Sequence, residues 1–184
     1  VVTDEADNCT AAPVVAFVSD VSDGLSCPET ITRTYSVTDD CGNQILVTQL
    51  ITINDVTAPV MAAAPADVTV ECAADVPAMV NLGWTDNCDG AGVVAGVDVS
   101  DGLSCPETIT RTWTYTDACG NSASVSQTIT VDDTTDPTAS NPAGINVECA
   151  ADVPAPDITV VTDEADNCTA APVVAFVSDV SDGL

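Results

Sequence analysis

The amino-acid sequence repeats itself, and the repeat limits the chain to folds built from small similar units. The segment ECAADVPA occurs at 71–78 and again at 148–155, and DVSDGLSCPETITRT occurs at 20–34 and again at 98–112. These spacings give a unit of roughly 78 residues. A unit of this length is a small domain, so we predict a tandem array of domains.

The repeats divide the chain into three parts. We predict that residues 57–134 form one complete repeat of type B, that 1–56 form the C-terminal part of a type A repeat, and that 135–184 form the N-terminal part of the next type A repeat. Residues 1–25 and 160–184 are identical. Two explanations are open: a segment of a longer array, or a subunit whose incomplete repeats are completed by neighbouring copies. Both predict a fibre.

Strand patterns fill the complete repeat. Alternating apolar and polar residues, interrupted by Gly, Pro, Asp and Asn, predict strands at 67–72, 78–84, 92–99, 108–117 and 123–131. No helical period competes with them. Short alternating strands are typical of a β-sandwich. We therefore predict an all-β fold of immunoglobulin-like sandwiches, stapled by disulfides and arranged head to tail.

The strand at 108–117 indicates which side chains are buried, because neighbouring residues of a strand point to opposite faces. One face carries the large apolar residues and the other carries threonines. The predicted core residues are Ile109, Trp113, Tyr115, Trp84, Ile31 and Tyr35. Arg111 falls on the inward face, and Arg33 is its equivalent in the preceding repeat. A buried arginine is costly without a partner, so we expect a carboxylate or carbonyl beside it.

Charge and composition exclude several classes of function. The formal net charge is −27, and the chain has 29 acidic residues, two basic residues and no histidine. A nucleic-acid or anionic-membrane partner requires a basic face, which two basic residues cannot form, so we expect neither partner. No apolar run is long enough to insert into a membrane. Histidine is the commonest general base, and no nucleophile–base pair is apparent, so we expect no enzyme activity.

Nine cysteines predict disulfides and an oxidising, extracellular setting. Cys105 and Cys119 bracket one long strand, so they lie too far apart to bond each other. If successive strands alternate in direction, Cys72 approaches Cys105 and Cys88 approaches Cys119. The predicted bonds are Cys72–Cys105, Cys88–Cys119 and Cys9–Cys41, with Cys27, Cys149 and Cys168 pairing outside the chain.

The pattern PADVTVEC…TDNC…TITRTWTYTDACGNSASVSQTITVDDTTDP resembles hyalin-type (HYR-like) repeats. These are immunoglobulin-like domains that occur in tandem in secreted and surface proteins. The cysteine-rich form is most similar to arrays in giant bacterial surface proteins of Bacteroidota, some of which are adhesins. The motif DTT at 133–135 resembles a bacterial O-glycosylation motif, which implies a glycan on Thr134.

Acidic residues precede a proline in each linker, INDVTAPV at 53–60 and VDDTTDPT at 131–138. The linkers resemble those of cadherins, where Ca²⁺ stiffens successive domains, and calcium requires six to eight oxygen ligands in one place. We predict Ca²⁺ sites at the inter-repeat junctions; hydrated acids without an ion are the alternative. The candidate ligands are Asp20, Asp23, Asp55, Asp86, Asp89 and Asp117 at the first junction, and Asp98, Asp101, Asp132, Asp133, Asp136, Asp163, Glu164 and Asp166 at the second.

These patterns together predict a structural extracellular fibre or stalk that serves surface adhesion or display. Its expected partners are further copies of the repeat and an unknown surface or glycan ligand. One alternative is a small subunit that polymerises by completing broken domains across copies. A second alternative is a carbohydrate-binding module, which the scarcity of aromatic residues disfavours.

Overall fold

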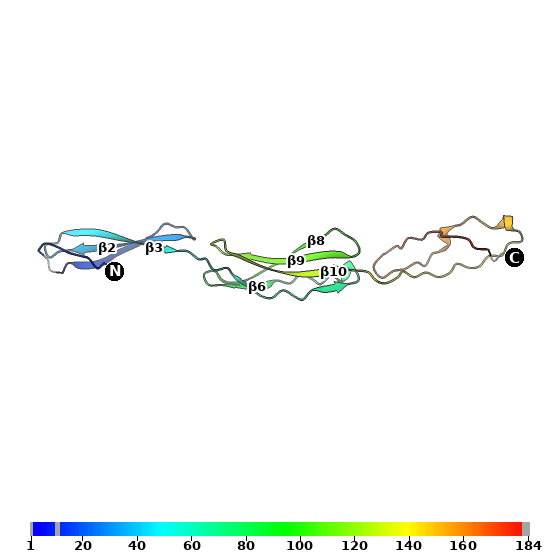
Figure 1. The fold of residues 1–184 in the computed structure, drawn as a ribbon, viewed down its shortest axis with the longest axis horizontal. Coiled ribbons are helices and arrows are strands. Elements are labelled where there is room, and N and C mark those ends of the chain that lie inside the picture. Colours follow the sequence, from blue (N-terminus) through cyan, green and yellow to red (C-terminus); the bar gives the residue numbers. More distant parts are fainter. Residues whose placement is uncertain (1, 10–11, 182–184) are drawn as a thin grey trace. The chain divides into compact units, whose positions relative to one another are not determined.

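The structure is a computed structural model that describes residues 2–9 and 12–181, and its regular structure consists of strands and short 3-10 helices. The strands form separate open sheets (Figure 1). They are β1 (Val14–Ser22), β2 (Glu29–Thr38), β3 (Gln44–Ile53), β4 (Val60–Met61), β5 (Val68–Val70), β6 (Leu82–Asp86), β7 (Gly90–Val94), β8 (Val97–Ser100), β9 (Glu107–Thr116) and β10 (Ser122–Val131). The 3-10 helices are η1 (Ala73–Asp75), η2 (Ala150–Asp152) and η3 (Ile158–Val160). The all-β prediction is confirmed.

The chain forms two compact units. The first contains residues 1–64, 80–96 and 113–125, and the second contains 65–79, 97–112 and 126–184. Strands β9 and β10 contribute residues to both units. The repeat boundaries near 57 and 134 stay a prediction.

The first unit contains an antiparallel sheet in the order β1-β2-β3. Alternation of Thr, Ile, Val and Tyr along β2 suits a strand that pairs on both sides. The sheet buries little: Ser36 and Val37 are buried, whereas Phe17 is 61% exposed and Leu50 is 69% exposed. The predicted core residues Ile31 and Tyr35 are half-buried on β2.

The first unit also contains the sheet β4-β6-β7. Trp84 of β6 stacks on Tyr115 of β9, with ring centroids 3.6 Å apart and an interplanar angle of 10°. The register places Gly92 opposite Trp84, and a Cβ atom at Gly92 would lie 2.7 Å from the indole ring. Glycine at this position therefore leaves the space that the tryptophan ring occupies.

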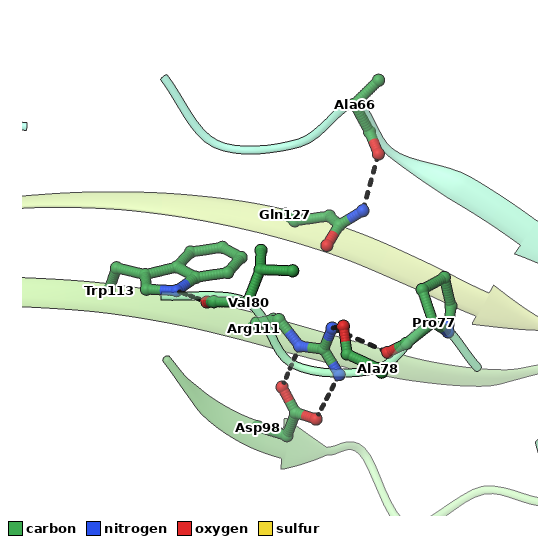
Figure 2. A network of polar contacts seen from close by, with 8 residues as sticks. All are labelled: Ala66, Pro77, Ala78, Val80, Asp98, Arg111, Trp113 and Gln127. Atoms are coloured by element: carbon green, nitrogen blue, oxygen red, sulfur yellow. Dashed lines mark hydrogen bonds and ion pairs between the residues drawn. The ribbon is translucent and has the colours of Figure 1, made fainter. Parts of the chain in front are cut away.

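A four-stranded sheet has the order β5-β10-β9-β8. Strand β8 is antiparallel to β9, and β5 is parallel to β10. Trp113 and Ile129 are fully buried in this sheet, and the Trp113 indole N–H donates to the carbonyl of Val80 at 2.8 Å (Figure 2). The contact joins β9 to the segment that leads into β6.

The predicted arginine partners are confirmed. Arg111 is 3% exposed, and its guanidinium forms a two-point ion pair with Asp98 at 2.7 and 2.8 Å. It also donates to the carbonyl of Pro77 at 2.9 Å (Figure 2). Arg33 binds Asp20 in the same way, at 2.8 Å. Strand pairing places each aspartate opposite its arginine.

One predicted strand, 92–99, is wrong as a single element. Residues up to Val94 belong to β7 in one sheet, and residues from Val97 belong to β8 in another. Ala95 and Gly96 connect the two strands. An alternating pattern does not reveal a change of sheet, because it continues through the connection.

Residues 135–181 carry little regular structure. Besides η2 and η3, the described part of this segment contains a bridge between Thr138 and Ala165. No helix among the described residues is long and apolar enough to cross a membrane.

Candidate metal centre

Three carboxylates meet in the first unit. Asp55 lies in the linker after β3, Asp86 ends β6, and Asp117 follows β9. One carboxylate oxygen from each lies within 4.8 Å of the other two. Asp117 is 7% exposed, and the other two residues are half-buried. The structure thus brings together three of the six acids predicted at the first junction.

The hairpin turn between β9 and β10 fixes the position of Asp117. Its Oδ1 accepts the backbone N–H groups of Cys119 at 2.9 Å and Asn121 at 2.7 Å. The Asn121 side-chain amide donates to Asp117 Oδ2 at 2.8 Å and to the backbone carbonyl of Asp55 at 3.0 Å. The sequence TDACGN therefore builds an Asx-type turn and ties it to the linker.

Asp55 and Asp86 each have one bonded and one unpaired oxygen. Asp55 Oδ1 accepts Thr57 N–H at 2.9 Å and the Asn87 amide at 3.2 Å, and Asp86 Oδ1 accepts Cys88 N–H at 2.8 Å. Asp55 Oδ2 and Asp86 Oδ2 are buried and have no hydrogen-bond partner among the described residues. Buried unpaired carboxylate oxygens are costly unless a proton or cation satisfies them.

Local hydrogen bonds favour the charged form of the linker acid. The Thr57 backbone N–H and then the Asn87 amide lower the pKa of Asp55 below its ordinary value. The neighbouring Cys88 thiol has a raised pKa, first because of its hydrogen bond to Asp55. A cluster of close carboxylates, one of them held in its ionised form, suits a hard cation with oxygen ligands such as Ca²⁺.

Other acids of the first predicted set do not join the cluster. Asp20 is held by Arg33, and Asp23 binds the backbone N–H groups of its own loop. Asp89 accepts the Tyr115 hydroxyl at 2.9 Å. The prediction that all six surround one ion is therefore corrected, because these three carboxylates are held by other partners.

The second predicted set does not form a three-carboxylate group among the described residues. Asp98 is held by Arg111, and Asp101 binds its own loop, as Asp23 does. Four of the remaining predicted residues have other contacts: Asp132 lies beside Cys105, Asp133 accepts from Thr135, Asp163 accepts from Ser140, and Asp166 accepts from Cys168 and Thr169. Asp136 stays a predicted ligand, and Glu164 Oε2 is buried and has no hydrogen-bond partner in the part of the chain that the structure describes.

Sequence equivalence nevertheless marks part of a second candidate site. Asp133 and Asp166 occupy the positions of Asp55 and Asp86, and Asp133 accepts Thr135 N–H just as Asp55 accepts Thr57 N–H. The counterpart of Asp117 belongs to the sequence motif TD-x-CGN, which does not occur within 135–184. The described chain therefore supplies two of three ligand positions there.

Thr134, the predicted glycosylation site, is exposed in the second unit. Its hydroxyl and its backbone N–H both donate to the Glu71 carboxylate at 2.9 Å. A glycan on this hydroxyl would replace the side-chain hydrogen bond. The glycosylation stays a prediction.

The disulfides differ from the predicted pairs. Cys27 bonds Cys119, and Cys72 bonds Cys168. The predicted pairs Cys72–Cys105, Cys88–Cys119 and Cys9–Cys41 are not formed, because Cys9, Cys41, Cys88, Cys105 and Cys149 are exposed free thiols. Cys27 and Cys168, expected to pair outside the chain, have partners within it.

Strand direction fixes where a cysteine lies but not the repeat that supplies its partner. Cys105 Sγ lies 3.7 Å from Asp132 Oδ1, and Asp132 N–H donates to the carbonyl of Val70, two residues before Cys72. Asp132 thus lies beside Cys105 and bonds the strand that leads to Cys72. Cys72 bonds Cys168 of another repeat instead, and Cys105 is a free thiol.

The comparison with known families finds a match for the central segment. Residues 60–131 match the family model described as an HYR-like domain with 4 cysteines. The match suggests an extracellular, immunoglobulin-like module of adhesion type, and the disulfides of the chain fit an oxidising setting. No curated protein and no solved structure matches the chain.

Proposed function

We propose that the chain is part of an extracellular fibre or stalk that serves surface adhesion or display, and that its role is mechanical rather than catalytic. The observation that carries this proposal is the connectivity of the disulfides, which join cysteines 92 and 96 residues apart. These separations exceed the repeat of roughly 78 residues. The bonds therefore connect successive repeats, as a load-bearing array requires.

Pulling on the ends of the chain tests this role. With both disulfides intact, tension cannot extend the segment of 96 residues that Cys72–Cys168 bridges. Reduction should add about 340 Å of contour length at roughly 3.5 Å per residue. Single-molecule force spectroscopy with and without a reductant measures this gain. The double variant Cys27→Ser/Cys72→Ser is the control and should show the full length without reductant. An unchanged length on reduction would refute the mechanical role.

We further propose that Asp55, Asp86 and Asp117 bind Ca²⁺ and fix the linker. Three carboxylates with two buried unpaired oxygens support this proposal. In this arrangement the ion would neutralise the cluster and hold the linker against the β9–β10 turn. The equivalent positions Asp133 and Asp166 would serve the following junction.

Terbium luminescence tests the calcium proposal, because Trp84 lies two residues before Asp86 and can sensitise a bound lanthanide. We expect saturable emission that Ca²⁺ displaces and that Asp86→Asn abolishes. Asp101→Asn, which changes an acid outside the cluster, should leave the emission unchanged. Equal emission from both variants would show diffuse binding to the acidic surface instead. A thermal melt that EDTA leaves unchanged would also count against the site.

A further inference from the structure

Every cysteine of the chain stands in one of four sequence words, and the word defines its position in the repeat. The word ECA contains Cys72 and Cys149; DNC contains Cys9, Cys88 and Cys168; LSC contains Cys27 and Cys105; and CGN contains Cys41 and Cys119. The nine cysteines thus reduce to four positions, each of which occurs more than once.

The two disulfides join these words in a fixed direction along the chain. Cys27–Cys119 joins an LSC cysteine to the CGN cysteine of the following repeat, and Cys72–Cys168 joins an ECA cysteine to the DNC cysteine of the following repeat. We infer that both bonds recur at every junction, so that each repeat is linked to the next by one ECA–DNC and one LSC–CGN disulfide.

This rule accounts for all nine cysteines. Two matched pairs from successive repeats occur in the chain, and both are bonded. The other five cysteines have no matched partner in an adjacent repeat of this chain, and these five are the free thiols. Pairing within repeats would instead permit three bonds, and none of those three is formed.

Local contacts support the rule independently, because two of the free thiols each share a contact with a bonded equivalent. Bonded Cys27 has its Sγ 3.6 Å from Asn54 Oδ1, and free Cys105 has its Sγ 3.7 Å from Asp132 Oδ1, at the equivalent linker position. The linker side chain therefore meets the LSC sulfur in both repeats.

The DNC cysteines show the same correspondence. The amide of Asn87 lies 3.1 Å from the sulfur of free Cys88, and the amide of Asn167 lies 3.1 Å from the sulfur of bonded Cys168. Free Cys88 is exposed in this arrangement. The contact of Cys88 with the preceding asparagine therefore matches that of its bonded equivalent.

The partner that fits is another copy of the repeat. Cys105 and Cys149 require the CGN and DNC cysteines of a following copy, and Cys9, Cys41 and Cys88 require ECA or LSC cysteines of a preceding copy. Each bond forms when two thiols lose two protons and two electrons to a disulfide oxidant such as oxidised glutathione, which leaves as two molecules of thiol. The inference depends on cysteine positions alone and holds whether or not the junction binds calcium.

The 184-residue chain can serve as its own partner in a test. We propose to reduce a mixture of ¹⁵N-labelled and unlabelled chains, reoxidise it with oxidised glutathione at high protein concentration, and alkylate the remaining thiols. Cleavage before aspartate then places each cysteine on its own peptide. The peptides of Cys9 and Cys168 are identical, so the measurement uses Cys9→Ser.

Mass spectrometry should find Cys27–Cys119 and Cys72–Cys168 within single copies. It should also find Cys105–Cys41 and Cys149–Cys88 as hybrids between labelled and unlabelled copies. In Cys105→Ser, Cys41 should stay alkylated while the Cys149–Cys88 link persists.

Three results would overturn the inference. The first is a bond within a repeat, such as Cys88–Cys119. The second is a set of links between copies that join the four kinds of cysteine at random. The third is that the free thiols persist and no link between copies forms. A longer native polypeptide with every cysteine bonded in the same word pairs, and with no link between chains, would support the rule and identify the partner repeats as parts of one chain.

Discussion

The pair of Arg111 and Asp98 allows a quantitative test of the core, because the chain carries an exposed version of the same pair. The Arg111 side chain is 4% exposed and that of Asp98 is 36% exposed, whereas Arg33 and Asp20 are 36% and 35% exposed. Replacing Asp98 with Asn removes the counter-charge and preserves the size. Arg111 then keeps its charge in a buried place with only carbonyl acceptors.

The expected cost follows from burial. Removing one partner of a fully buried ion pair destabilises a protein by about 3–5 kcal/mol. Asp98 is partly exposed to water, and the carbonyls of Pro77 and Ala78 still accept from Arg111, so we expect about 2–3 kcal/mol. Asp20→Asn, the matched control, should change stability very little, because water already screens that pair.

Urea unfolding measures the difference. Trp84 and Trp113 are the two tryptophans of the chain, so tryptophan fluorescence reports on residues 57–134. At an m value of about 1–3 kcal/mol per molar urea, the midpoint of Asp98→Asn should fall by roughly 1 M or more with an unchanged slope. Equal effects of Asp98→Asn and Asp20→Asn would refute the reasoning from burial.

The pH dependence provides a second check. The hydrogen bonds from Arg111 lower the pKa of Asp98. The pair therefore stabilises the folded chain fully above the ordinary aspartate pKa of about 3.9, and this stabilisation is lost as the pH falls through the lowered value. The difference between wild type and Asp98→Asn should be constant near neutral pH and shrink below about pH 4. A difference that persists in acid would show that the variant acts through packing instead.

Two further substitutions test the packing. Gly92→Ala places a methyl group 2.7 Å from the Trp84 ring and should lower the free energy of unfolding by about 1–3 kcal/mol. Gly83→Ala, whose Cβ would meet no atom closer than 3.9 Å, should lower it less. The midpoints of urea unfolding compare the two variants. Trp113→Phe leaves the carbonyl of Val80 without its donor and opens a void, and calorimetry should find a loss of about 2–4 kcal/mol.

The sequence predicted the class of fold because its information on strands is local. Alternation along residues 108–117 and 123–131 corresponds to β9 and β10, and the buried Trp113 was predicted from the same alternation. The split of 92–99 into two strands could not be predicted, since the sheet to which a strand belongs depends on distant partners.

The acids show the same limit at the level of the site. Fourteen acidic residues were candidates, and three of them meet. Which acids meet depends on hydrogen bonds that the composition does not reveal. Arg33 and Arg111 hold two of the acids elsewhere, and the TD-x-CGN turn positions Asp117. A signal was present nevertheless, because Asp55 and Asp86 recur as Asp133 and Asp166 in the next copy.

The disulfide connectivity follows from the small size of the repeat. The described residues bury few large side chains, with Trp113 and Ile129 the largest of those fully covered. A domain of this size gains little stability from its core, so covalent links contribute a larger share. A bond within a repeat would stabilise that repeat alone, whereas a bond to the next repeat also restricts the linker. Cys27–Cys119 and Cys72–Cys168 therefore suit the proposed array, in which force would pass from one repeat to the next.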